Sequence, residues 1–431
     1  MMREEGSVPL TQERNELLTR VGPGTPMGGM MREYWMPALR SAALERDGRP
    51  VRVRLVGEDF VAFRATDGSV GFVDEACPHR GASLALGRNE KGGLRCIFHG
   101  WKIDPAGKLV DAPCEPAAHR GAFMAAQTVR AFPVREAGGI VWVYLGKAAV
   151  PPRFPEFEFT ALPESHVDIR RGLVNYNWLQ GLEAHIDSSH VGVLHSGFIA
   201  SGAGGGQASD LRLTMVDTAP EFEMDVTAYG LREGALREVG EGRLYARIRQ
   251  IVLPFYTFIP GSNGNACQGR ATVPVDDEWD AEWYIVYDPE KPLPAERLAS
   301  LYGGAAPDPD NFTANLGTRE NFWHQDRAAM TAGHWSGLTR NIPFEDFIIQ
   351  SSMGPRVDRS REQLGVGDAI IVKVRRMLID AVEAFQRGEP AAWQSAAIDY
   401  AAIRALAVTY PRGQDWRQFA PDFAAHQSAA E

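Results

Sequence analysis

Short apolar runs dominate the first third of the chain, and several of them alternate with polar residues at a period of two. Such alternation is typical of half-buried strands, and Asp67-Gly68, between two of the runs, is a hairpin signal. We expect strands at 51–56, 61–65, 70–73 and 139–145. The pattern therefore predicts an all-β domain over residues 34–150.

Helical and linker signals flank this region. Residues 1–33 form a polar lead with a predicted helix at 11–21, and the Gly- and Pro-rich residues 22–26 end it. A Pro-rich stretch at 151–155 is a suitable linker to a second domain. The length of 431 residues also favours two domains.

Helices and strands mix over residues 151–431. We expect a helix at 175–194 and strands at 244–253 and 282–287. Asp368 is a suitable N-cap for a long amphipathic helix that Gly388 ends. Two Gly-rich or Pro-rich stretches, 201–209 and 303–311, are predicted loops. The predicted fold class is α+β, with an N-terminal all-β domain and a C-terminal mixed α/β domain that contains an antiparallel sheet and helices.

Composition excludes several classes of protein. The net charge of -10 argues against general nucleic-acid binding and against a polybasic membrane surface. No apolar run has the length of a bilayer span, and the first residues show no secretory signal. With only four cysteines, a reducing, cytoplasmic location is expected.

Two Cys-His pairs carry the strongest chemical signal: Cys77-Pro78-His79 and Cys96-Ile97-Phe98-His99. Two thiolates and two imidazoles can hold a Rieske 2Fe–2S cluster, with cysteine on one iron and histidine on the other, and such a centre relays single electrons. A zinc site is the alternative, but zinc sites usually pair Cys with Cys and His with His.

A second group of candidate ligands lies on the helix predicted at 175–194. Asp187 and His190 are three positions apart and would share one face. His190 and His195 are five apart, so both could reach one metal only if a π-bulge or a helix end intervened at 191–193. With a distant carboxylate they would complete a two-His-one-carboxylate iron site. Without one, they are ordinary histidines.

These residues resemble the oxygenase component of the Rieske non-haem iron oxygenases, in particular the phthalate 4,5-dioxygenase-like group. The matching stretches are 77–84, 96–102, 183–195, 325–330 and 345–354. The resemblance implies a 2Fe–2S cluster on Cys77, His79, Cys96 and His99, and a mononuclear Fe(II) on His190, His195 and Asp346. Glu345 and Asp326 remain alternatives for the carboxylate ligand.

The same resemblance assigns roles beside the metals. It implies that Asp187 bridges the two centres, between the cluster of one subunit and the iron of its neighbour. Glu183 is a further catalytic candidate near the iron, although many relatives carry Asn there, and a supporting role is the alternative.

The resemblance also implies a function. The chain would be a terminal oxygenase that uses O2 and two electrons to cis-dihydroxylate a small aromatic carboxylic acid of the phthalate or benzoate type. Its expected partners are an NADH-dependent flavin and iron–sulfur reductase and further copies of the chain in a homotrimer or a multiple of it. The alternatives are O-demethylation, ether cleavage or dehalogenation of an aromatic acid, a pure Rieske electron carrier, and a zinc-binding module.

A substrate carboxylate needs a cationic or hydroxyl partner. Arg247 and Arg249 lie two positions apart on a predicted strand, so both side chains would share one face. Ser188 is a further candidate, next to Asp187. The alternative for the arginines is a solvent-facing charged strand.

Overall fold

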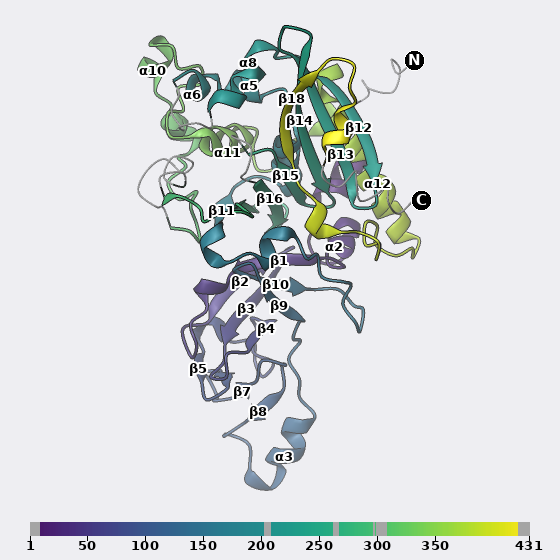
Figure 1. Cartoon of the computed structure of the whole chain (residues 1–431). Coiled ribbons are helices and arrows are strands. Elements are labelled where there is room, and N and C mark those ends of the chain that lie inside the picture. Colours follow the sequence, from purple (N-terminus) through teal and green to yellow (C-terminus); the bar gives the residue numbers. More distant parts are fainter. Residues whose placement is uncertain (1–8, 202–207, 262–266, 296–297, 299–307, 421–431) are drawn as a thin grey trace. The chain divides into compact units, whose positions relative to one another are not determined.

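The computed structural model describes residues 9–201, 208–261, 267–295, 298 and 308–420 (Figure 1). The chain divides into two compact units. One contains Val21–Gly24 and Gly28–Phe154, and the other contains the residues up to Arg20, Thr25–Met27 and the chain from Pro155 onward. The 11–21 prediction is a helix in the structure, α1 (Gln12–Thr19), which Thr11 caps, and it belongs to the second unit.

The first unit is built from short antiparallel strands in three sheets, ordered β1-β10-β9, β2-β3-β4 and β5-β6-β7-β8. The strands are β1 (Trp35–Arg40), β2 (Val51–Leu55), β3 (Glu58–Arg64), β4 (Val70–Asp74), β5 (Arg88–Glu90), β6 (Gly93–Arg95), β7 (Lys102–Ile103), β8 (Leu109–Asp111), β9 (Val134–Ala137) and β10 (Ile140–Tyr144). Helix α2 (Pro26–Met31) precedes β1. Between β1 and β10, the described residues of this unit form one α-helix, α3 (Ala117–Ala125). The all-β prediction is confirmed.

One apolar core of this unit lies directly beneath the two Cys-His loops. Its buried members include Phe63, Leu94 and Trp101, and the side chains of Cys77 and Cys96 belong to the same cluster. Packed apolar side chains leave the two thiols little freedom to move. The core therefore fixes the positions of both cysteines.

The second unit contains an eight-stranded antiparallel sheet, ordered β11-β17-β16-β15-β14-β13-β12, with β18 paired to β14. Its strands are β11 (Val167–Val174), β12 (Glu221–Thr227), β13 (Gly230–Glu238), β14 (Arg243–Val252), β15 (Tyr256–Ile259), β16 (Cys267–Pro274), β17 (Asp280–Tyr287) and β18 (Leu406–Pro411). Both strands predicted for this region are present, so the α+β fold class is confirmed.

Helices complete this unit: α4 (Trp178–Ile186), α5 (Val191–Leu194), α6 (Ser196–Ser201), α7 (Ala208–Leu211), α8 (Leu213–Val216), α10 (Arg327–Thr331), α11 (Ile342–Ser352) and α12 (Ala369–Gln386). Helix α4 packs against β15, β16 and β17 and is contacted by α1, α11 and α12. Because α4 is enclosed in this way, the residues that follow it are held in fixed positions. Within the described ranges, no helix combines the length and the apolar character needed to cross a membrane.

The structure corrects two details of the predicted elements. The single helix at 175–194 is wrong, because α4 ends at Ile186 and the short helix α5 begins only at Val191. Asp368 precedes α12, but its carboxylate accepts a hydrogen bond from the backbone N–H of Gly365 and not from the helix. Most of the two predicted loops, 201–209 and 303–311, lies outside the described residues.

Candidate metal centres

The two Cys-His loops share one backbone pattern. The Cys77 N–H donates to the Ala82 carbonyl at 2.8 Å, and the Gly81 N–H returns to the Cys77 carbonyl at 2.8 Å. In the second loop, Cys96 and Gly100 make the equivalent bonds, at 2.8 and 3.0 Å. Both glycines have positive φ, 74° and 75°, which a residue with a Cβ adopts only at a cost. Each glycine therefore closes a tight loop around its cysteine.

The four candidate ligands of these loops gather at one place. Cys77 and Cys96 are 3% and 2% exposed, and the centroids of the His79 and His99 rings are 4.4 Å apart. The His79 ring stacks on Trp101, with centroids 4.6 Å apart. Trp101 thus covers one face of a candidate ligand.

The chemistry of this donor set fits a metal cluster. Burial raises the pKa of the Cys77 thiol to about 11, so two neighbouring buried thiolates need a cation to stabilise them. Burial and the nearby charges of His79 and Arg80 lower the pKa of His99, which keeps its imidazole neutral as a ligand must be. The buried Nδ1 of His99 has no hydrogen-bond partner among the described residues.

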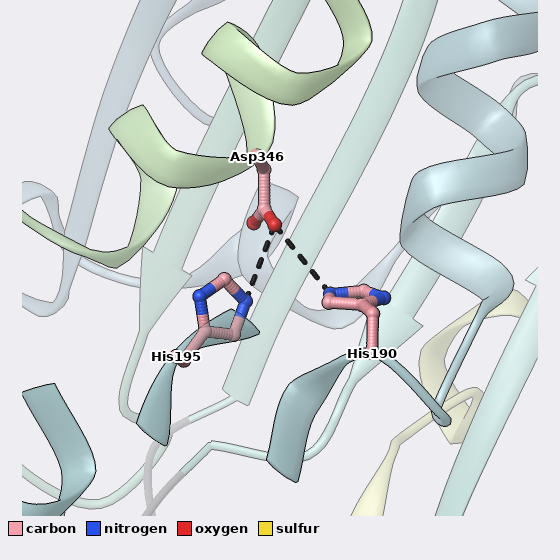
Figure 2. A group of neighbouring side chains, drawn as sticks. All are labelled: His190, His195 and Asp346. Atoms are coloured by element: carbon pink, nitrogen blue, oxygen red, sulfur yellow. Dashed lines mark ion pairs between the residues drawn. The ribbon is translucent and has the colours of Figure 1, made fainter. Parts of the chain in front are cut away.

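The second group joins two segments that are far apart in sequence. Ligand atoms of His190, His195 and Asp346 all lie within 4.8 Å of one another. Figure 2 shows both imidazoles directed at the Asp346 carboxylate, whose Oδ1 lies 3.4 Å from Nε2 of His190 and 3.2 Å from Nε2 of His195. A two-His-one-carboxylate set of this kind suits Fe(II) and leaves open coordination positions.

The break between α4 and α5 makes this convergence possible. Asp187 is the C-cap of α4, and its Oδ1 accepts a hydrogen bond from the Ser189 N–H at 2.7 Å. The chain turns there, so His190 and His195 flank the short helix α5 instead of lying on opposite sides of a continuous helix. The interruption was expected at 191–193 but occurs before His190.

A carboxylate holds the Nδ1 atom of each imidazole. Nδ1 of His190 lies 3.1 Å from Oδ2 of Asp187, and Nδ1 of His195 lies 2.8 Å from Oε2 of Glu345. The Ser336 hydroxyl donates to the other oxygen of Glu345. Such partners fix the Nδ1–H tautomer and leave both Nε2 lone pairs free to bind a metal.

Three carboxylates were candidates for the third metal ligand, and their contacts distinguish between them. Glu345 is occupied with His195 Nδ1, and Asp326 caps α10 by accepting the Ala329 N–H at 2.9 Å. Asp346, on α11, is the carboxylate that faces both Nε2 atoms. The geometry therefore favours Asp346 over the other two candidates.

The pKa values show a site that attracts positive charge. Although burial lowers it, hydrogen bonds to Asp187 and Asp346 raise the pKa of His190 to about 10. Burial opposes ionisation of Asp346, but the charges of the two imidazoles outweigh it and hold the pKa of that carboxyl far below its usual range. A divalent cation would satisfy the same electrostatic demand.

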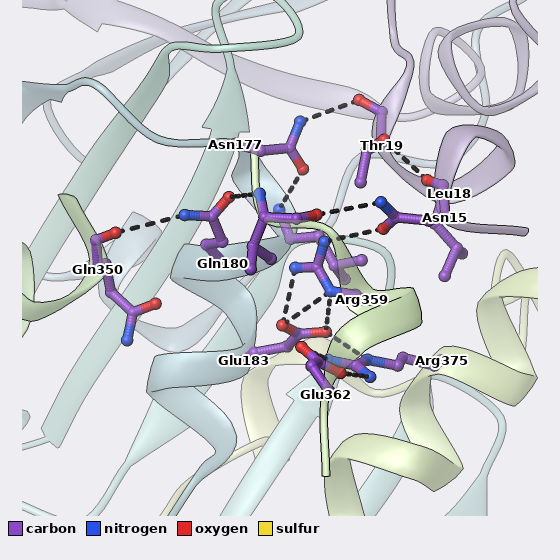
Figure 3. Close-up of polar contacts among 12 residues, drawn as sticks. Asn15, Leu18, Thr19, Asn177, Gln180, Glu183, Gln350, Arg359, Glu362 and Arg375 are labelled. Atoms are coloured by element: carbon purple, nitrogen blue, oxygen red, sulfur yellow. Dashed lines mark hydrogen bonds and ion pairs between the residues drawn. The ribbon is translucent and has the colours of Figure 1, made fainter. Parts of the chain in front are cut away.

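Glu183 is placed differently from the sequence-based expectation. Its carboxylate lies 2.8 Å from Arg359 and 2.6 Å from Arg375, and neither arginine belongs to the metal group (Figure 3). Arg359 also donates to Asn15 of α1, and Arg375 contacts Glu362. Both arginines engage this carboxylate, which ties α4 to α1 and α12, and these contacts favour the supporting role for Glu183, while its catalytic role stays a prediction.

The predicted substrate residues lie on β14, and both arginines are buried. Arg249 forms a fully enclosed ion pair with Glu233, at 2.5 Å, and donates to the His185 carbonyl. Within the described ranges, the hydrogen bonds of the Arg247 side chain are two long contacts, at 3.4 Å, to the Tyr245 hydroxyl and the Pro260 carbonyl. The alternative of a solvent-facing charged strand is wrong, because Arg247 is only 4% exposed and Arg249 only 2%.

Sequence reasoning missed Arg237, on β13, which is fully buried. It donates to the carbonyl and hydroxyl oxygens of Ser188, while its Nη1 has no partner among the described residues. Burial and the charges of Arg247 and Arg249 lower its pKa to about 10. Arg237 lies on a strand that the sequence pattern did not predict, and its contact with Ser188 arises only in the folded chain, so no local signal pointed to it.

Comparison with known proteins agrees with this geometry. Residues 34–133 match the Rieske [2Fe-2S] domain family, and residues 143–431 match the family described as LigXa C-terminal domain like. The chain is 38% identical to the phthalate 4,5-dioxygenase oxygenase subunit of Pseudomonas putida, over 95% of this chain and 94% of the relative. It is also 38% identical to the 3-chlorobenzoate-3,4-dioxygenase oxygenase subunit of Comamonas testosteroni, over 86% and 88%.

A solved structure shows the same fold at low sequence identity. It is the reduced complex between oxygenase and ferredoxin in carbazole 1,9a-dioxygenase, with a TM-score of 0.55, 16% identity, and coverage of 90% of this chain and 97% of that one. At this identity the likeness concerns architecture alone.

The contact between Glu345 and His195 generates a prediction. Replacing Glu345→Gln keeps an acceptor for the imidazole but removes the charge, so we expect Fe(II) to bind roughly 10-fold more weakly. Titration of the iron-depleted enzyme with Fe(II) measures this. Visible absorbance of the cluster serves as the internal control and stays unchanged, and Fe(II) affinity equal to that of the wild type would contradict the orienting role.

Proposed function

Because the chain belongs to the Rieske non-haem iron oxygenases, and matches both the Rieske [2Fe-2S] and the LigXa-like C-terminal domain families, we propose that it cis-dihydroxylates a small aromatic carboxylic acid of the phthalate or benzoate type. The enzyme is an oxygenase component with a Rieske cluster and a mononuclear iron. The convergence of His190, His195 and Asp346 carries the proposal, because it can present open iron positions to O2.

We assign the ligands from the contacts described above. Cys77, Cys96, His79 and His99 hold the cluster, in an iron–sulfur domain over residues 34–150. The three residues of the second group hold Fe(II), in a catalytic domain over residues 151–431, with residues 1–33 as the N-terminal segment. When bound, the cluster supplies electrons one at a time, and the mononuclear iron supplies a site at which O2 and the ring can react.

Asp187 has two tasks in this scheme. One oxygen accepts the Ser189 N–H and the other contacts His190 Nδ1, so the carboxylate both ends α4 and orients a ligand. We propose that it also bridges to the cluster of a neighbouring subunit. A head-to-tail trimer, in which each interface is heterologous and the ring closes, provides such a neighbour.

Electrons come from a separate electron-transfer partner. The relatives are named as oxygenase subunits, and the structural neighbour is an oxygenase bound to ferredoxin. For this chain we propose an NADH-dependent flavin and iron–sulfur reductase as the donor.

Substrate recognition is proposed to depend on Arg247, Arg237 and Ser188. Among the residues that the structure describes, neither arginine is ion-paired with a carboxylate, although both are buried. A buried guanidinium without a counter-ion is costly, and a substrate carboxylate would neutralise it. Arg249, in contrast, is already neutralised by Glu233, so we assign it a structural role.

The two strand arginines form a matched pair for mutation. Arg247→Met is expected to raise KM for an aromatic acid roughly 10- to 100-fold, the loss of one charge-assisted hydrogen bond, with the fold intact. Arg249→Met leaves Glu233 buried and unpaired and is expected to cost about 3–5 kcal/mol of stability.

Steady-state kinetics and chemical denaturation measure these two effects. If Arg247→Met unfolds the protein while Arg249→Met changes only KM, the assignment of roles is reversed.

The proposed bridge predicts that Asp187→Asn keeps both metals but loses electron delivery. We expect reoxidation of the cluster during a single turnover to slow by roughly 10- to 100-fold. Stopped-flow absorbance measures this directly. Asp358→Asn is the control, because Asp358 accepts the Ser360 N–H in the same local geometry at an exposed site. Unchanged reoxidation in Asp187→Asn would remove the bridging role.

The reaction itself is tested with labelled oxygen. Incubation of the enzyme, a reductase and a phthalate or benzoate under ¹⁸O2 is expected to give a cis-dihydrodiol in which both hydroxyl oxygens carry the label. Mass spectrometry of the product decides, with labelled water and ordinary O2 as the control. Formaldehyde, or a phenol formed with loss of a methyl or halide group, would instead establish the alternative of demethylation or dehalogenation.

A further inference from the structure

Two acidic side chains are enclosed beneath helix α4, outside the metal group. Asp280 and Glu282, on β17, both have 0% exposure. Because side chains alternate along a strand, the two share one face of the sheet with Tyr284. Helix α4 packs against this part of the sheet.

Glu282 makes close contact with two residues of the metal-bearing segment. Its Oε1 accepts a hydrogen bond from the Tyr176 hydroxyl at 2.8 Å, and its Oε2 lies 3.4 Å from Nε2 of His185 on α4. A Cβ at Gly181 would lie 2.3 Å from Oε1. The helix therefore approaches the carboxyl group only because glycine occupies that position.

Among the described residues, neither acid forms an ion pair with an arginine, in contrast to two other carboxylates of this unit. Glu233 is paired with Arg249, and Glu183 with Arg359 and Arg375. In the described part of the chain, Nδ1 of His185 has no hydrogen-bond partner, and Oε2 of Glu282 and the carboxyl oxygens of Asp280 have none apart from the contact between the two acids themselves.

The charged and titratable groups that face Glu282 do not supply a counter-ion. They are Tyr176, His185, Arg270, Asp280, Tyr284 and Asp346. Arg270 stacks over the Tyr284 ring at 3.7 Å and donates to the Gly269 carbonyl and the Gln268 side chain. Its guanidinium is thus bonded to neutral oxygens and makes no ion pair with the acid.

Because it is enclosed and has no counter-ion among the described residues, the carboxyl group of Glu282 is neutral near pH 7. Burial raises the pKa of Glu282 to about 8 and that of Asp280 well above its ordinary value, and burial lowers the pKa of His185 to about 3. A carboxylic acid thus stands beside an unprotonated imidazole. The charges of Asp346 and His190 also act on the pKa of His185, so this imidazole lies within electrostatic range of the metal group.

The proposed reaction requires protons at an enclosed site. An aromatic ring, O2, two electrons and two protons give one cis-dihydrodiol, and the electrons arrive from the partner protein without protons. This inference rests on the proposed function. We propose that Glu282 stores one of these protons and that His185 conducts it toward the mononuclear metal site.

The transfer is balanced and involves no change of oxidation state. The O–H bond of Glu282 breaks as a new N–H bond forms at Nε2 of His185, and the imidazole releases the proton from Nδ1. Glu282 remains as a carboxylate until it regains a proton, and Asp280, the next acid on the same strand face, shares a hydrogen bond with it. Glu282 acts on the substrate only through His185, so it is a positioning and proton-supplying residue.

The test is Glu282→Gln, which keeps an acceptor for Tyr176 but has no proton to give. We expect unchanged cluster absorbance and Fe(II) binding, and kcat for product lowered about 100-fold, with peroxide released in place of product. The variant also loses the rise in rate that follows protonation of the acid below about pH 8 in the wild type. These measurements use the holoenzyme with its reductase.

A second readout does not depend on turnover. The infrared spectrum of the iron-depleted wild type is expected to contain a protonated-carboxyl band at pH 7 that disappears as the pH rises through about 8. Glu282→Gln removes the component of the band that disappears near pH 8, while the contribution of the buried Asp280 remains. The control Glu362→Gln, at a carboxylate paired with Arg375, leaves the band unchanged.

Tyr176→Phe keeps the proposal testable if Glu282→Gln does not fold. The hydrogen bond from Tyr176 lowers the pKa of Glu282. Loss of this hydrogen bond is therefore expected to raise the pH at which the protonated-carboxyl band disappears. Wild-type kinetics and pH profile in a folded Glu282→Gln, or no protonated-carboxyl band that responds to either variant, would overturn the proposal. Failure of the wild type to oxygenate any aromatic acid would instead overturn the proposed function.

Discussion

The catalytic unit depends on two hydrogen bonds, in each of which a carboxylate holds the Nδ1 atom of an imidazole. Asp187 fixes His190, and Glu345 fixes His195, so both Nε2 atoms face Asp346. An imidazole without such a partner can rotate and can carry its proton on either nitrogen. The fold must therefore place the end of α4 and the start of α11 together, and most of the surrounding polar contacts serve that requirement.

Buried ion pairs supply much of this placement. Glu183, with Arg359 and Arg375, joins α4 to α12, and Arg359 extends the contact to Asn15 of α1 (Figure 3). Removing one partner of such a network leaves an uncompensated charge, which is far more costly than never burying the pair. Glu282 differs because no arginine of the described residues forms an ion pair with it, and its enclosure favours a stored proton over a structural charge.

The sequence predicted local features better than features created by folding. The Cys77 and Cys96 loops were recognisable because ligand types and glycines lie close together in the chain, and the β-strands followed from their period of two. The break at Asp187 was misplaced, since a carboxylate that accepts the Ser189 N–H ends the helix without any Gly or Pro signal. The contacts of Glu183 with two arginines and the contact of Arg237 with Ser188 depend on segments distant in sequence, which no local pattern encodes.

The central claim is that one polypeptide holds two unlike iron centres in the proposed ligand sets. Iron and acid-labile sulfide analysis of the purified protein, with an electron paramagnetic resonance spectrum after dithionite reduction, tests it most directly. The account predicts about three irons and two sulfides per chain, a Rieske signal, and selective loss of about one iron in His190→Ala. About two irons per chain in the fully loaded wild type, unchanged in His190→Ala, would contradict it.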